Sequence, residues 1–194
     1  YKRSNSRWKT QVHVYQNDNL LFSTKSVKDK IMGKMHIVNF NNLMNANYAN
    51  SGIIVRRSKG TMFTLYENYN TIISNNRQLA GFVFYTELKD KKYRKINLAI
   101  PIYDCTIIND EKELSKIALE GEGCQHVIVF SSSIKNESYP IKSKKNFTIY
   151  DNFVVPIFRF YKLSKKVFKV KFRPPLTHLI AYSICIAILS SHHL

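Results

Sequence analysis

Apolar and polar residues alternate along most of this chain with the period of two that is typical of β-strands. In residues 94–100, Ile96, Leu98 and Ile100 fall on one face and Lys95, Asn97 and Ala99 fall on the other, which predicts a half-buried strand. Residues 8–22 have the pattern of a hairpin whose turn is the QNDN sequence at 16–19. Further runs rich in β-branched and aromatic residues cover 35–40, 52–58, 61–68, 77–87, 126–130, 146–150, 157–163 and 167–172. The pattern predicts a mainly β protein of about ten strands.

Residues 110–120, DEKELSKIALE, break this alternation. Acidic residues crowd the start, Leu114, Ile117 and Ala118 have helical spacing, and Gly121 follows as a stop signal. The segment therefore predicts one amphipathic helix on the surface. Paired carboxylates also occur in acid and base catalysis, but on an exposed helix we interpret them as a solvated face.

Residues 176–189, LTHLIAYSICIAIL, form an apolar run without any charge. As a helix, the run would be apolar on every side. Pro174 and Pro175 stand directly before it, where proline suits the first helical turn. The helix would be about 21 Å long at roughly 1.5 Å per residue, which is short of the ~20 residues that cross a bilayer. We therefore predict a helix that is enclosed by protein.

An enclosed apolar helix restricts the possible folds. A sheet can surround such a helix by closing into a barrel, which also removes exposed strand edges. We predict a closed antiparallel β-barrel around a central hydrophobic C-terminal helix. The 194 residues fit a single domain, with residues 1–30 as the N-terminal hairpin of the barrel and residues 175–191 as the central helix.

The charge of the chain bears on its partners. Lys and Arg number 30 against 13 Asp and Glu, so the net charge is +17. This charge attracts anionic partners, and both nucleic acid and anionic lipid qualify, while a basic surface without a specific partner is the alternative. Cys105, Cys124 and Cys185 form no CxxC pair, which favours a reducing compartment. The first residues lack the apolar core of a secretory signal, so we expect no export.

An enzyme would need a nucleophile and a base, for which the candidates are Cys105 or Cys124 with His126 or His36. Nothing in the sequence brings these residues together. The sequence contains no GxSxG motif, no HExxH motif and no phosphate-binding glycine loop. We therefore expect no catalytic activity, no metal site and no cofactor.

Five sequence blocks resemble those of the tubby-like proteins. GTMFTLYEN at 60–68 resembles the family sequence GTKFTVYDN, and RQLAGFVFY at 77–85 is similar to RQELAAVCY. RKINLAIP at 94–101 is similar to RKMSVIVP, SKKNF at 143–147 to SVKNF, and PLTHLIAYSI at 175–184 to PLCALQAFAI. The blocks occur in the family order. The resemblance implies a closed barrel of roughly a dozen strands threaded by the hydrophobic C-terminal helix.

The resemblance also implies a function. Tubby-like proteins bind phosphoinositides that carry phosphates at positions 4 and 5, and this binding tethers them reversibly to the inner leaflet of the plasma membrane. The expected location is therefore cytoplasmic and peripheral at the plasma membrane, with the cilium and the nucleus as further locations. The expected partners are anionic headgroups, the inner leaflet, and membrane-protein cargo or a trafficking complex.

The family headgroup site maps onto cationic residues of this sequence. Arg77 matches the arginine of RQELA without a gap. With one deletion, Arg56 falls on the arginine of GKLRSN and Ile54 on its lysine, while Lys34 falls on the asparagine of SNYLIS. Arg57 takes the arginine position if the gap lies elsewhere. The resemblance thus implies a phosphoinositide site of Lys34, Arg56, Arg57 and Arg77, in which guanidinium groups fork onto phosphate oxygens and lysine adds a mobile charge.

Three alternatives stay open at this point. Ile54 stands where the family has lysine, so the chain could be a degenerate barrel that acts as a protein-interaction scaffold without binding lipid. A scramblase-like membrane protein would instead insert its C-terminal helix. Nucleic acid is a third option, although no recognition helix or stacking platform is visible in the sequence. Nonspecific attraction to an anionic leaflet or to nucleic acid would come from the cationic residues Lys162, Lys165, Lys166, Lys169, Lys171 and Arg173.

Overall fold

The computed structural model describes residues 12–16, 19–29, 33–40, 52–57, 61–67, 77–86, 94–102, 113–122, 127–132, 138–143 and 145–190. In these residues the chain forms one antiparallel sheet of eleven strands and two helices, which confirms the prediction of a mainly β protein. The first seven strands are β1 (His13–Gln16), β2 (Asn19–Asp29), β3 (Gly33–Phe40), β4 (Gly52–Arg57), β5 (Met62–Glu67), β6 (Gln78–Thr86) and β7 (Arg94–Pro101). The remaining elements are α1 (Leu114–Glu120), β8 (Val127–Ser131), β9 (Phe147–Tyr150), β10 (Pro156–Lys162), β11 (Phe168–Phe172) and α2 (His178–Ser190).

Each strand pairs with the next strand along the chain. Because every neighbouring pair is antiparallel, the even-numbered strands all run one way and the odd-numbered strands all run the other way. The sheet therefore has two rims. The basic rim contains Lys28 near the end of β2, Lys34 near the start of β3, Arg56 near the end of β4 and the turn at 163–167. The opposite rim contains the starts of β4 and β6, the turn at 151–155, and Arg173 after β11.

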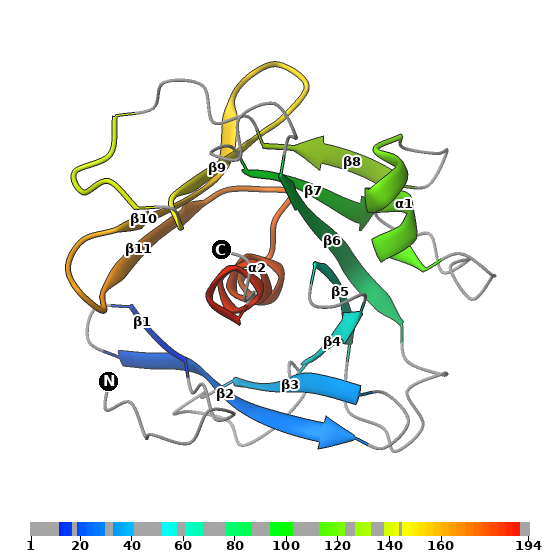
Figure 1. The fold of residues 1–194 in the computed structure, drawn as a ribbon, viewed down its shortest axis with the longest axis horizontal. Coiled ribbons are helices and arrows are strands. Elements are labelled where there is room, and N and C mark those ends of the chain that lie inside the picture. The colour runs from blue at the N-terminus through cyan, green and yellow to red at the C-terminus, as the bar shows by residue number, and fades with distance from the viewer. Residues whose placement is uncertain are drawn as a thin grey trace.

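The sheet curls around α2, which lies in the middle of the strands in Figure 1. The nine helix residues 180–188 are all buried. They pack against core side chains of the strands, and the aromatic ring of Tyr182 stacks on Phe22 with centroids 4.9 Å apart. The predicted burial of the apolar helix is thus confirmed. Complete closure of the barrel stays a prediction, because in the described residues the strand order runs from β1 to β11 without a ladder joining these two.

The start of α2 differs from the prediction. The helix begins at His178, so Pro174 and Pro175, which are joined by a cis peptide bond, precede the first turn and do not form it. Thr177 caps the helix instead, because its hydroxyl accepts a hydrogen bond of 3.3 Å from the backbone N–H of Ile180. Inside the core, the hydroxyl of Ser183 donates to the backbone oxygen of Leu179 (2.8 Å), which satisfies this buried polar group within the helix.

The predicted surface helix forms as α1, but its expected acidic first turn does not. Glu113 precedes the helix with an extended backbone, and its carboxylate accepts hydrogen bonds from the hydroxyls of Thr64 (3.1 Å) and Tyr66 (3.2 Å) on β5. Gly121 ends the helix at a φ of 78°, as predicted. The helix therefore begins where an acidic side chain is bound to the sheet.

Helix α1 covers the outer face of β6 and β7 (Figure 1). Asn97 and Ala99, which we expected on the solvent side of β7, are buried beneath it, and the Asn97 side-chain amide donates to the backbone oxygen of Ala118 (2.9 Å). Strand β7 is thus buried on both faces and is not half-buried. Gly81 makes the close approach possible, because a Cβ there would lie 2.2 Å from the backbone carbon of Leu114.

Neither of the helices in the described part of the chain combines the length and the apolar character needed to span a membrane.

Candidate anion-binding site

Three cationic residues on neighbouring strands form a row at the basic rim. The β2·β3 ladder pairs Lys28 with Lys34. The β3·β4 ladder ends with the pair Met35 and Val55, and Lys34 and Arg56 are the next residues of the two strands beyond this pair. Directly opposite residues have Cβ atoms about 5 Å apart. The row Lys28, Lys34 and Arg56 therefore consists of three basic residues at the same end of three neighbouring strands.

The row lies at the end of the sheet face that packs on α2. Alternation along β4 puts Arg56 on the same face as Ile54, and Arg56 pairs with Phe63 of the core. Arg56 is half-buried, and burial lowers the pKa of its guanidinium group. Arg56 is thus at the edge of the hydrophobic core, where its charge is screened less than on an open surface.

His36 lies beside this row on β3. It is buried, and its Nδ1 atom lies 3.0 Å from the hydroxyl oxygen of Ser26 on β2. Burial, and then the positive charge of Arg56, lower the pKa of His36 from 6.5 to about 4. His36 is therefore neutral at physiological pH, and it could interact with an anion only as a hydrogen-bonding group.

The structure separates the other two cations implied by the family resemblance from this row. Arg57 pairs with Met62, and alternation places it on the other face of β4 from Arg56. Arg77 is exposed on the opposite rim, where its backbone oxygen accepts a hydrogen bond from the N–H of Glu67 (2.8 Å). Along β5, Glu67 is four residues from the partner of Arg56, which corresponds to about 13 Å.

Ile54 provides a further difference from the family pattern. The residue aligned with the family lysine has no exposed surface and belongs to the core around α2. A lysine at this position would have to bury its charge. The row of Lys28, Lys34 and Arg56 was not identified from the sequence, because Lys28 joins it only through the β2·β3 register.

The turn at 163–167 extends the basic rim. The backbone N–H groups of Leu163 and Ser164 both donate to the backbone oxygen of Val167, at 2.9 and 3.2 Å. Below the turn, Phe168 stacks on the buried ring of Phe160 with centroids 4.8 Å apart. The turn is therefore closed by its own backbone and anchored in the core.

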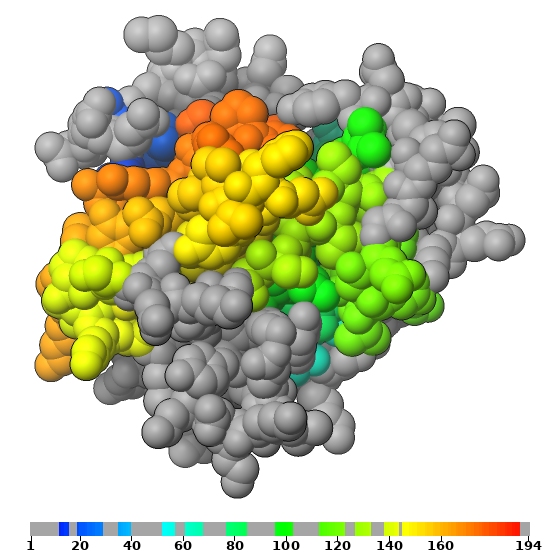
Figure 2. Space-filling view, turned by 90° about the horizontal axis from the view of Figure 1, so that it is seen from above, coloured from blue at the N-terminus to red at the C-terminus, as the bar shows by residue number. Residues whose placement is uncertain are grey.

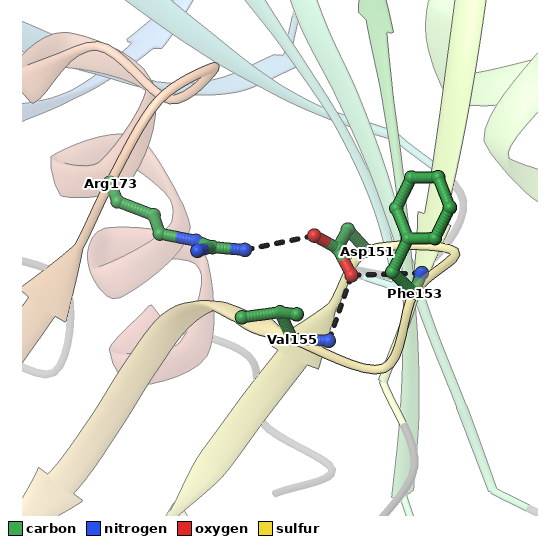
Figure 3. Close-up of polar contacts among 4 residues, drawn as sticks. All are labelled: Asp151, Phe153, Val155 and Arg173. Carbon is green, nitrogen blue, oxygen red and sulfur yellow. Dashed lines mark hydrogen bonds and ion pairs between the residues drawn. The ribbon is translucent and has the colours of Figure 1, made fainter.

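The turn at 151–155, on the opposite rim, is built differently. Figure 2 shows it in yellow, at the surface beside the orange segment that leads to α2. The Asp151 carboxylate accepts hydrogen bonds from the backbone N–H groups of Phe153 (3.0 Å) and Val155 (2.8 Å), and it binds the Arg173 guanidinium at 2.8 Å (Figure 3). Val154 has a φ of 62°, which is unfavourable for a β-branched residue. The turn displays Phe153 with 86% of its surface exposed.

Of the catalytic candidates from the sequence, the structure describes only His36. Cys105, Cys124 and His126 lie outside the described residues. Cys185 is in the core, where burial raises the pKa of its thiol. Within the described ranges, no group of three His, Cys, Asp or Glu side chains is placed to hold a metal ion.

Comparison with known proteins adds no family assignment, because no protein-family model matches the chain and no curated protein is significantly similar to it.

Proposed function

We propose that this chain is a tubby-like barrel that binds phosphoinositide headgroups with phosphates at positions 4 and 5 and thereby tethers itself to the inner leaflet of the plasma membrane. The row of Lys28, Lys34 and Arg56 is the observation that carries the proposal. Like charges at directly opposite strand positions destabilise a sheet. An anion bound at this rim would offset the repulsion between the paired residues Lys28 and Lys34.

The chemistry of the row suits a phosphomonoester. A guanidinium group can donate two parallel hydrogen bonds to phosphate oxygens, and lysine contributes a movable charge. Vicinal phosphates on one inositol ring present two such groups side by side. Adjacent strands about 4.8 Å apart offer cations at a similar spacing. The five family-like blocks, the strand order and the buried terminal helix support the same proposal.

A protein-interaction scaffold that does not bind lipid is the second candidate. The fully buried Ile54 favours it, because the cation implied by the family pattern is missing at that position. The exposed Phe153 and Val154 also favour it, since a rigid apolar tip can enter a pocket of a partner protein.

Flotation with lipid vesicles separates these candidates. Vesicles with phosphatidylinositol 4,5-bisphosphate are compared with vesicles in which phosphatidylserine supplies the same total charge. We expect the full chain to float preferentially with the phosphoinositide vesicles. We expect Lys34→Ala and Arg56→Ala each to weaken this binding by at least about tenfold, as loss of a charged hydrogen bond of about 1.5–3 kcal/mol implies.

Lys171→Ala is the matched control, because this exposed lysine of β11 lies away from the row. Thermal unfolding of each variant checks that the fold is retained. Equal flotation with both kinds of vesicle would refute phosphoinositide recognition, and failure to float with either would favour the scaffold.

A further inference from the structure

The turn between β10 and β11 combines exposed apolar side chains with lysines. Leu163 and Val167 are 43% and 52% exposed, although both are large and apolar. The hydrogen bond between Leu163 and Val167 closes the turn, so the two residues stand at its base next to each other. The lysines that surround them in the chain are Lys162, Lys165, Lys166 and Lys169.

We infer that this turn is a second membrane contact, in which Leu163 and Val167 enter the interface of an anionic leaflet while the neighbouring lysines bind lipid phosphates. Elements that lie in a membrane interface combine a small apolar surface with Lys or Arg in this way. Each lysine near an anionic leaflet contributes a favourable attraction. The inference rests on the proposed function for the membrane at which the contact would form. The contact itself needs only anionic lipid and not a particular headgroup.

The strand directions allow this turn and the row of Lys28, Lys34 and Arg56 to face the same membrane. The turn at 163–167 and the row of Lys28, Lys34 and Arg56 both belong to the basic rim, because β2, β4 and β10 run in the same direction. A leaflet that contacts the row therefore faces the same rim as the turn. The stacked rings of Phe160 and Phe168 anchor the turn to the core, so its position relative to the rim is fixed.

The turn at 151–155 serves as an internal comparison. It exposes more apolar surface, with Phe153 and Val154 at 86% and 76%, but it lies on the opposite rim. Arg173, which contacts this turn, forms an ion pair with Asp151 of the turn. Charge complementarity to an anionic leaflet thus favours the turn at 163–167, although hydrophobicity alone would favour the turn at 151–155.

Tryptophan fluorescence tests this choice directly. The chain has one tryptophan, Trp8, so a Trp8→Phe background allows a single new probe at either turn. We expect Leu163→Trp to shift its emission to the blue with phosphatidylserine vesicles and to be quenched by lipids that carry a quencher on the acyl chain. We expect Phe153→Trp to show neither effect. A blue shift of Phe153→Trp alone, or no response from either probe, would overturn the inference.

Binding of variants provides the quantitative test. The double variant Leu163→Ser with Val167→Ser should bind phosphatidylserine vesicles about tenfold more weakly, since burying each of these side chains at an interface recovers part of its transfer free energy. The matched variant Phe153→Ser with Val154→Ser should bind like the wild type. If both double variants bind equally, the inference is wrong.

A second variant guards against misfolding. Lys165→Gln with Lys166→Gln leaves the apolar residues in place and should weaken binding about fivefold per lysine at low salt, with the difference vanishing at high salt. An unchanged affinity would contradict the inference. Failure of the phosphoinositide preference, with these effects on phosphatidylserine vesicles intact, would refute the proposed headgroup site and leave the second contact standing.

Discussion

The two turns that flank β10 end the same strand with opposite chemistry. The turn at 151–155 exposes Phe153 and Val154 and holds its one acidic side chain in an ion pair with Arg173. The turn at 163–167 exposes less apolar surface but lies among lysines. The comparison teaches that the more exposed apolar side chains and the cluster of lysines lie at opposite ends of β10, so the two rims differ in the surface that they present to partners.

Both rims depend on the same core, so the largest effect should come from a charge in α2. Ile184 has no exposed surface, and Ile184→Asp would bury a carboxylate without a cationic partner in the hydrophobic core. We expect the fold to be lost, because such burial costs several kcal/mol against a typical stability of about 5–15 kcal/mol. Circular dichroism and denaturation would show this, with Ile184→Val as the control that should remain folded.

The basic rim should lose stability in acid because of His36. Its folded pKa of about 4 lies below the unfolded value of 6.5, so the unfolded state binds the proton first as the pH falls. Stability is therefore fully present above pH 6.5 and is lost progressively between pH 6.5 and 4, by at most about 3.4 kcal/mol at roughly 1.36 kcal/mol per pKa unit.

Urea denaturation at pH 7 and pH 4.5 measures this effect. His36→Gln should reduce the difference between the two pH values by most of this amount. If wild type and variant lose the same stability on acidification, His36 is not the group responsible.

The opposite rim should respond most to loss of the Asp151 carboxylate. Asp151→Ala removes the acceptor of two backbone N–H groups and the partner of Arg173, and we expect a loss of about 1–2 kcal/mol in the free energy of unfolding. Arg173→Gln removes only the exposed ion pair and should cost less than about 1 kcal/mol. A larger effect of Arg173→Gln than of Asp151→Ala in urea denaturation would show that the ion pair, and not the backbone hydrogen bonds, holds the turn.

The smallest expected effect is a gain in stability. Val154 has a positive φ that glycine adopts without strain, so Val154→Gly should stabilise the protein by about 0.5–1 kcal/mol. Val155→Gly, one position later, lacks this benefit and should not stabilise. Thermal unfolding of the two variants compares them, and equal effects would mean that the backbone at Val154 is not strained in solution.

The sequence predicted the elements of this fold well because local periodicity determines them. Phe168, Val170 and Phe172 face the core while Lys169 and Lys171 are exposed, as their alternation indicated. The alternating pattern of the first hairpin was followed only to residue 22, although the hairpin was assigned to residues 1–30, and β2 continues to Asp29. That extension carries Lys28, whose charge made the segment look unlike a strand.

The candidate site was harder to predict from the sequence than the strands and helices were, because it depends on strand register. Lys28, Lys34 and Arg56 meet only through two ladders, and Arg77, the strongest match to the family pattern, lies on the other rim. The covering of β7 by α1 depends on Gly81, whose role is a close approach and not a turn. The turn at 151–155 contains no glycine, so its positive φ at Val154 had no sequence signal.

The most direct test of binding at the basic rim is the affinity of Arg56→Ala and Arg77→Ala for vesicles with phosphatidylinositol 4,5-bisphosphate, measured in parallel with the wild type. If the headgroup binds at the row, Arg56→Ala should lose about tenfold in affinity, and Arg77→Ala should lose clearly less. An equal or larger loss for Arg77→Ala would place the headgroup at the opposite rim and contradict this account.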